Sequence, residues 1–507
     1  MKNFKLLSLT TILLTSGLVA CSGDDDGDDT TVTPPGMSLQ AQAVESGQVN
    51  YSDGAGLSVS QTLAIDVSGA SIGAPTQALP GAFAAADYYG AVDPAAAMGW
   101  WQGWTYINSG ADGTLPGDNF HPLEAEITGG TITPAGTNDC ATVNADFGDG
   151  GTVMIFGASF PVCVLSQDIT ADTTLPNTHV YVLAGTISVG TGMMQLSGGS
   201  PSSSATLTID AGVQIFAAEG QASSLVITRG SRIAANGTSD LPIILSAVAV
   251  DGSNNITGDP TNLLDRGVWG GLVLSGMARE NSGDTNGELT TEAAPPDAER
   301  WFGGMSDGDT SGTVRYMVIA ESGYEFRPDE EVQGLTLEAV GSGTTLEYIQ
   351  VIGSEDDCVE WFGGAVDVSY LICNGVDDDA LDMDEGFSGN VQFVIVRMGS
   401  DNGDRGIESD GNGSNFDAQP YTAPNLANVT ILGNPGREDG NTSAILHREG
   451  WRGKVYRSVF TDDMLGGGGF ESGCLDIDDV VPSALAHYDS VFNCTGGPLI
   501  DDDDVEE

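Results

Sequence analysis

The central part of the chain reads Leu346-Glu347-Tyr348-Ile349-Gln350-Val351, and the same kind of six-residue run returns as Val368-Ser369-Tyr370-Leu371-Ile372-Cys373 and Val391-Gln392-Phe393-Val394-Ile395-Val396. The runs begin 22 and then 23 residues apart. Each is rich in β-branched and aromatic residues, and Gly, Asn and Asp separate it from the next. The pattern predicts short β-strands, one from each of several successive coils of similar length.

Further copies lie on both sides of this centre. Leu207–Ile215 is followed 18 residues later by Leu225–Ile233, and weaker copies begin at Val429, Val455 and Tyr488. Strands of successive coils that pair at about 4.8 Å can stack their inward side chains into one continuous core. A β-sandwich also has many short strands, but it does not need the same residue types to recur at one coil length. We therefore predict a β-solenoid.

Two segments carry a family resemblance. Leu225-Val226-Ile227, Gly230-Ser231-Arg232-Ile233 and Pro242-Ile243-Ile244-Leu245 resemble the first coils of right-handed parallel β-helix surface proteins, and Val268-Trp269-Gly270-Gly271-Leu272-Val273-Leu274 resembles their next coil. The resemblance covers roughly residues 200–500. It implies an all-β, pectin-lyase-like β-helix, which we place at residues 176–500, before an acidic tail at 501–507. This fold carries lyases, hydrolases and adhesins, so it does not define an activity.

The N-terminus has the order of an export signal. Lys2 and Lys5 precede an apolar run from Leu6 to Leu18, and Leu18-Val19-Ala20-Cys21 follows. This end resembles a bacterial lipobox, which implies removal of residues 1–20 and lipidation of Cys21; the alternative is an ordinary signal peptide with a chance cysteine. Residues 21–36 form an acidic tether that resembles the surface-export signal of Bacteroidetes lipoproteins. We expect an exported outer-membrane lipoprotein at the cell surface, although periplasm-facing lipoproteins also carry such tethers.

The composition is strongly acidic. The 507 residues contain 72 Asp and Glu against 16 Lys and Arg, for a formal net charge of −56, while 40% of the residues are hydrophobic. A chain of this composition can build a large core. The negative field repels phosphate backbones and so excludes nucleic acid as a partner. An acidic polysaccharide could bind only through cations between the two surfaces.

Six cysteines follow Cys21, and an even number in an exported chain predicts disulfides. Of the 15 possible pairings we favour the sequential one, because separations of 23, 15 and 20 residues suit neighbouring coils. A metal thiolate at Cys358 or Cys474 is the alternative. The residues concerned are Cys140, Cys163, Cys358, Cys373, Cys474 and Cys494.

Residues 37–175 have no such repeat and carry the aromatic clusters Tyr88-Tyr89 and Trp100-Trp101-Gln102-Gly103-Trp104. A solenoid exposes core at its ends and needs caps. We predict that this is an irregular capping or accessory region whose rings cover the first coil. A stacking platform for sugar rings is the alternative.

Acidic residues recur at one position of successive coils. Alternation turns Val359, Leu381, Ile407 and Leu475 inward and Glu360, Asp382, Glu408 and Asp476 outward, so the acids should stack on a solvent-facing surface, with a second column at Asp384, Asp410 and Asp478. Adjacent carboxylates repel by about 1 kcal/mol in water. Raised pKa values, Arg side chains or divalent cations could offset the repulsion, and a solvated face screened by salt is also consistent. Clustered oxygen ligands suit Ca²⁺. The candidate ligands are Asp356, Asp357, Glu360, Asp377, Asp378, Asp379, Asp382, Asp384, Glu408 and Asp410.

These features favour a Ca²⁺-binding surface protein that acts in adhesion, or that binds a polysaccharide or a neighbouring cell-surface protein. The alternative is a polysaccharide lyase or glycoside hydrolase that uses the acids around residues 377–385, with Asp378 and Asp382 as acids and Arg405 as base. Repetition of the acids over several coils favours a structural role, because an active site needs one constellation in one cleft.

Overall fold

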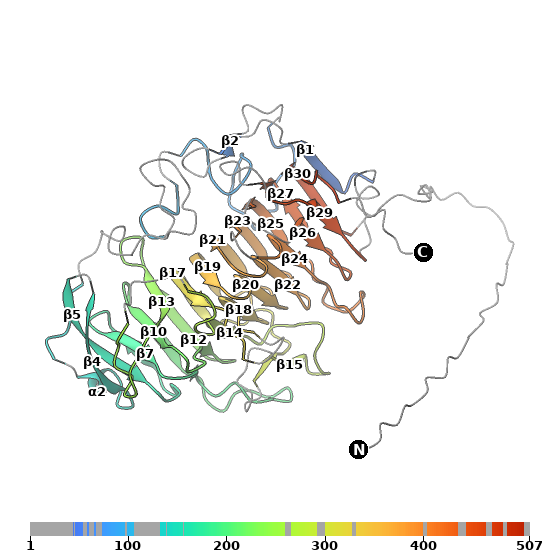
Figure 1. Ribbon diagram of the computed structural model, residues 1–507. Helices are drawn as coiled ribbons and strands as arrows, with labels where there is room; N and C mark the ends of the chain where they lie inside the picture. The colour runs from blue at the N-terminus through green and yellow to red at the C-terminus, as the bar shows by residue number, and fades with distance from the viewer. Residues whose placement is uncertain are drawn as a thin grey trace, which may run out of the picture. The chain divides into compact units, whose positions relative to one another are not determined.

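The computed structural model describes residues 44, 46–53, 58–59, 65–66, 74–96, 99–105, 132–137, 139–155, 157–258, 265–291, 300–326, 331–398, 403–433, 443–462, 469–479 and 484–500. The expected signal peptide, Cys21, the tether and the acidic tail lie outside these residues. In the described part of the chain, no helix has the length and apolar composition needed to cross a bilayer. Nearly all of its regular structure is β-strand (Figure 1).

Two large sheets contain most of the strands. Sheet 1 has 17 strands: β1 (Val49–Asp53), β4 (Gly148–Ile155), β5 (Ala158–Leu165), β6 (Thr173–Leu175), β7 (Val180–Leu183), β9 (Thr206–Ile209), β10 (Gln214–Ala218), β12 (Arg232–Asn236), β13 (Ile243–Val248), β17 (Gly312–Ser322), β19 (Thr345–Ser354), β21 (Asp367–Asn374), β23 (Asn390–Arg397), β25 (Asn425–Leu432), β27 (Lys454–Tyr456), β28 (Val459–Thr461) and β30 (Ala486–Asn493).

Sheet 2 has nine strands: β8 (Ile187–Val189), β11 (Leu225–Ile227), β14 (Leu272–Ser275), β18 (Leu335–Glu338), β20 (Val359–Phe362), β22 (Leu381–Asp384), β24 (Ile407–Ser409), β26 (Ser443–His447) and β29 (Gly473–Ile477). The remaining elements are β2 (Ser58–Val59), β3 (Ile65–Asp66), β15 (Glu288–Thr290), β16 (Trp301–Gly303) and the helix α2 (Cys140–Val143).

The chain alternates between the two sheets, and each coil pairs with the next in parallel. Leu346 of β19 lies beside Val368 of β21, which lies beside Val391 of β23. In sheet 2, β18, β20, β22, β24, β26 and β29 follow one another in the same way. Inward side chains of both sheets form one buried core. The predicted parallel β-helix is therefore confirmed, and its parallel pairing begins at β5, earlier than the expected boundary at residue 176.

Sheet 1 bends at one position of every later coil. There the backbone takes a positive φ between 49° and 61°, at Tyr316, Tyr348, Tyr370, Phe393, Asn428, Arg457 and Asp489. Such a conformation costs an L-residue roughly 1–2 kcal/mol. The four rings among these residues recover part of that cost by stacking, with centroids 4.4, 4.3 and 4.9 Å apart along the column. We call these seven residues the bend column.

Residues 74–105, which we call the lateral segment, pack along the bend column rather than over the first coil. Asp489 accepts hydrogen bonds from the backbone N–H groups of Thr76 (2.8 Å) and Gln77 (2.7 Å). Asn428 Nδ2 donates to the carbonyl of Tyr88 at 3.0 Å. The contacts therefore move from the last coil towards earlier ones as the segment proceeds.

The tryptophans of the lateral segment complete this packing. Trp100 lies edge-on to Tyr370 at 5.3 Å, and Trp104 lies edge-on to Tyr316 at 5.5 Å. The rings of Trp101 and Trp104 are fully buried. The sequence prediction that the aromatic clusters cover the first coil is wrong, and these two rings cannot serve as a sugar platform. The outward rings of the bend column form an apolar surface, and the tryptophans cover it.

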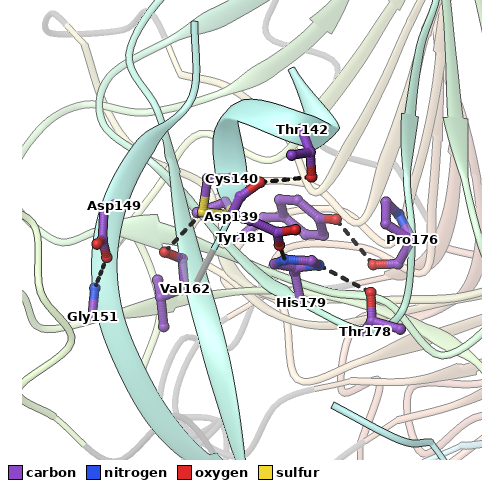
Figure 2. Close-up of a disulfide and its surroundings, with 11 residues drawn as sticks. Asp139, Cys140, Thr142, Asp149, Gly151, Val162, Pro176, Thr178, His179 and Tyr181 are labelled. Atoms are coloured by element: carbon purple, nitrogen blue, oxygen red, sulfur yellow. Dashed lines mark hydrogen bonds and ion pairs between the residues drawn. A yellow bond between two sulfur atoms is a disulfide. The ribbon is translucent and has the colours of Figure 1, made fainter. Parts of the chain in front are cut away.

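Other parts of residues 37–175 lie at both ends of the solenoid. At the start, β4 pairs antiparallel with β5, and the Cys140–Cys163 disulfide joins α2 to β5 (Figure 2). Beside it, the Tyr181 hydroxyl donates to the carbonyl of Pro176 at 2.9 Å, and His179 Nε2 lies 3.3 Å from Asp139. At the far end, β1 pairs in parallel with β30 of the last described coil.

The three disulfides are Cys140–Cys163, Cys358–Cys373 and Cys474–Cys494, which confirms the sequential pairing. The cysteines are therefore unavailable as metal thiolates. Cys358 precedes a sheet 2 strand and Cys373 belongs to sheet 1, so that bond ties the two sheets of a coil together across the core.

Candidate metal centre

The acids predicted to stack do lie on adjacent strands of sheet 2. Glu360 of β20 is paired with Asp382 of β22, and Asp382 with Glu408 of β24. The flanking Val359, Leu381 and Ile407 are completely buried, as alternation requires. The register inferred from the repeats is therefore confirmed over these three coils.

The column stops at β26. Leu446 lies between Glu408 and Asp476, so Asp476 is separated from the other acids. The neighbouring column is interrupted in the same coil: the Arg448 N–H bonds to the Ser409 carbonyl, and the Asp478 N–H to the His447 carbonyl. Arg448 thus lies between the rows of Asp410 and Asp478, and the acidic cluster ends at β24.

The turns that precede these strands add the most buried acids. Asp357 and Asp379 are 5% and 3% exposed. The carboxylate of Asp357 accepts a hydrogen bond from the Asp379 N–H at 2.8 Å, and that of Asp379 accepts one from the Arg405 N–H. The prediction of a solvated acidic face is wrong here, because each turn directs its carboxylate against the backbone of the next coil.

The turn acids and strand acids form three overlapping groups. Within each group, one carboxylate oxygen per residue lies within 4.8 Å of the others. We call them the acid triads: Asp356, Asp357 and Asp378; Asp357, Glu360 and Asp382; and Asp378, Asp379 and Asp404. Because Asp357 and Asp378 are each shared by two triads, the three form one connected cluster over three coils.

Arginines neutralise the edges of this cluster. Arg448 makes a bidentate pair with Asp410 (2.7 and 2.8 Å) and reaches Glu408 at 3.3 Å. Arg405 pairs with Asp404 and lies 3.4 Å from Glu408. Arg266 pairs with Asp377. In the described part of the chain, no arginine forms an ion pair with Asp357, Asp379 or Asp382.

The lack of local compensation shifts the acidity of these groups. Burial, reinforced by the charge of Asp356, raises the pKa of Asp357 well above its ordinary value. Burial and the charge of Glu408 raise the pKa of Asp379, and burial and the charge of Asp410 raise that of Asp382. A raised pKa means that ionised carboxylates are costly at these positions unless a positive charge joins them.

The donor set fits a hard divalent cation. All ligand atoms of the acid triads are carboxylate oxygens, which Ca²⁺ prefers, and Ca²⁺ accepts six to eight of them in flexible geometry. Within the described residues, Asp382 Oδ1 is buried and has no hydrogen-bond donor. A buried acceptor of this kind is costly unless it has a partner, and a bound cation would supply one.

The predicted ligands divide into two groups. Six belong to the acid triads: Asp356, Asp357, Glu360, Asp378, Asp379 and Asp382. Four lie outside them: Asp377, Glu408 and Asp410 pair with arginines, and Asp384 accepts a hydrogen bond from the Glu385 N–H. Asp404 belongs to a triad but was not among the predicted ligands. Its position before β24, matching that of Asp378 before β22, was the signal for it.

The residues of the alternative catalytic interpretation are not assembled as one constellation. No triad among the described residues contains both Asp378 and Asp382. Arg405 is engaged by Asp404 and Glu408. The acid cluster is therefore arranged for binding a cation rather than for acid–base catalysis by these three residues.

The parallel coils and the acids before the sheet 2 strands coincide with a known protein family. Residues 167–473, more than half of the chain, match the pectate-lyase-like β-helix domain. The chain belongs to this family. The pectate-lyase-like domain thus begins near β6 and includes all three acid triads. A carbohydrate-related role fits such a domain. Comparison with curated proteins and with solved structures gives no match.

Proposed function

We propose that this pectate-lyase-like β-helix is a Ca²⁺-binding carbohydrate-binding protein of the cell envelope. The observation that carries the proposal is the connected cluster of acid triads on β20, β22 and the turns before them. Cations held there would give an otherwise strongly acidic protein a positive feature with which to bind an acidic glycan or a neighbouring surface protein.

The energetic argument rests on the buried acids. Asp357, Asp379 and Asp382 lie close together, out of water, and without an arginine partner among the described residues. Protonation removes their charge at the expense of the raised pKa values, whereas a divalent cation stabilises all of them in the ionised form. Because Ca²⁺ requires ionised oxygens, its binding should displace protons from the cluster.

Calorimetric titration of the chelator-treated protein with Ca²⁺ tests the proposal. We expect saturable binding and a higher melting temperature. The double variant Asp357→Asn/Asp382→Asn keeps the shapes of both side chains and should weaken Ca²⁺ binding at least tenfold. Asp240→Asn, an exposed acid outside the triads, removes charge as well and should bind like the unchanged protein.

Two results would refute the cation site: no heat and no change in melting at millimolar Ca²⁺, or equal loss of affinity in the double variant and in Asp240→Asn. The carbohydrate role is tested separately. The loaded protein should retain polygalacturonate, and chelation should abolish retention. Release of unsaturated or reducing sugars during that assay would instead support the lyase or hydrolase alternative.

We also propose that the protein is held in the outer membrane by a lipid on Cys21. The support is the Leu18-Val19-Ala20-Cys21 motif and the Asp-rich run that follows it. Two acyl chains suffice for stable anchoring. Labelled fatty acid should be incorporated into the native protein and not into Cys21→Ser; equal labelling of both would show that Cys21 is not the anchor.

A further inference from the structure

A pocket of about 430 Å³ opens on sheet 1, between the lateral segment and the outer face of β19, β21 and β23. Ligand pockets usually measure about 300–1,000 Å³. The pocket lies on the sheet that contains the bend column, whereas the acid triads belong to sheet 2 and its turns. It is therefore separate from the proposed cation site and goes beyond the proposed function.

The lateral segment forms one wall of this pocket. The side-chain amide of Gln392 holds the wall in place: its oxygen accepts from the Ala84 N–H at 2.8 Å, and its Nε2 donates to the Ala84 carbonyl at 3.0 Å. Phe83 projects beside Ala84 and contacts Tyr456 edge-on at 6.4 Å. Because Ala82 and Ala84 are small, the wall stays clear of the sheet and leaves the pocket open.

The opposite side offers an apolar edge and a polar floor. Tyr370 and Phe393 are stacked on each other, so their ring edges, not their faces, border the pocket. The floor consists of Thr345, Ser369 and Asp367, which stand on adjacent strands. Within the described residues, the hydroxyls of Thr345 and Ser369 make no hydrogen bond, so both remain available to a ligand.

The charged groups at the pocket are fixed in place. Asp367 accepts hydrogen bonds from the backbone and side-chain N–H groups of Asn390 at 2.9 and 2.7 Å. Glu347 is paired with Arg315 at 2.9 Å. Carboxylate and amide oxygens held in this way accept hydrogen bonds from ligand hydroxyls. In a chain of net charge −56 they also repel anions.

The ligand that matches these features carries many hydroxyls, has an apolar ring face and bears no negative charge. We propose that this pocket binds a neutral hexose unit of a glycan, with Phe83 against the sugar ring and the floor residues bonded to its hydroxyl groups. Uronic acids and sulfated sugars are disfavoured there. The protein would then hold neutral sugar on sheet 1 without Ca²⁺ and acidic partners on sheet 2 with Ca²⁺.

Filling the pocket tests this inference. Thr345 and Thr208 occupy one outward column of sheet 1, three coils or about 14 Å apart, and both are half-buried. Thr345→Trp should fill the pocket, and Thr208→Trp is its matched control. Titration calorimetry in chelator, with neutral gluco-, manno- and galacto-oligosaccharides as probes, should show binding that Thr345→Trp weakens at least tenfold and that Thr208→Trp leaves unchanged.

Phe83→Ala supplies an independent check, because it removes the ring without adding bulk, and it should weaken binding at least fivefold. The proposal is overturned if none of the neutral probes binds, if uronate oligomers bind as tightly as they do, or if Thr345→Trp binds as the control does. Since every titration contains chelator, failure of the cation site would not affect the outcome.

Discussion

In chelator, the free energy of unfolding is expected to fall by several kcal/mol as the pH rises from 5 to 8, and Ca²⁺ should remove most of that loss. The cause is the raised pKa of Asp357, Asp379 and Asp382. Between the ordinary carboxyl pKa near 4 and the raised folded values, the native state binds more protons than the unfolded state, so stability decreases with pH. Each unit of difference corresponds to about 1.4 kcal/mol per group.

Two buried histidines act in the opposite direction. Burial lowers the pKa of His447 well below its ordinary value and that of His487 to about 3. A lowered histidine pKa gives stability that is present above about pH 6.5 and is lost as the pH falls. The acid contribution is therefore measured as the difference between the native protein and Asp357→Asn/Asp382→Asn, in which the histidines are unchanged.

Urea unfolding of both proteins at each pH, with and without Ca²⁺, gives this difference directly. In chelator at pH 8 the double variant should be more stable than the native protein, since it has lost two buried charges. With Ca²⁺ the order should reverse. If native and variant stability run parallel over the whole pH range, these acids do not ionise within the cluster and the cation site has no energetic basis.

Trp104→Ala is expected to destabilise the protein by about 3–5 kcal/mol, the usual cost of truncating a buried tryptophan. The Trp104 ring is 0% exposed, lies against Tyr316 and Tyr348 of the bend column, and donates its N–H to the carbonyl of Trp100 at 2.9 Å. Its removal leaves a cavity between the lateral segment and sheet 1. Cleavage in the lateral segment should then precede cleavage of the solenoid during limited proteolysis.

Phe416→Ala is the control for this variant, because Phe416 is 40% exposed and its truncation should change the unfolding free energy by less than about 0.5 kcal/mol. A loss below about 1 kcal/mol in Trp104→Ala, with unchanged proteolysis, would show that the lateral segment does not depend on its tryptophans. Chemical denaturation and mass spectrometry of the fragments provide the two measurements.

The repeats were sufficient to predict the solenoid and much of its register. Identical residue types at one coil length can be buried only if successive coils superimpose, so the Leu346, Val368 and Val391 runs determined their own pairing. The separations of the cysteines carried the disulfide pairing for the same reason. Alternation within the strands also predicted correctly which side of sheet 2 bears Glu360, Asp382 and Glu408.

Two features could not be read from the pattern. The lateral segment has no period, and its contacts with the bend column are more than 200 residues away in sequence, as for Trp104 and Tyr316. The burial of Asp357 and Asp379 comes from hydrogen bonds between turns of adjacent coils, which alternation along a strand does not encode. Both features depend on tertiary contacts, and both determine where the candidate sites lie.

The pairing of β1 with β30 has a consequence for assembly. A parallel solenoid that ended at β30 would present bare N–H and C=O groups to the first strand of another molecule, an invitation to head-to-tail fibres. Here the earliest strand to be synthesised occupies that edge, yet its partner is among the last to emerge. The chain therefore seals itself against polymerisation only once it is complete, and a truncated product would keep a growing end.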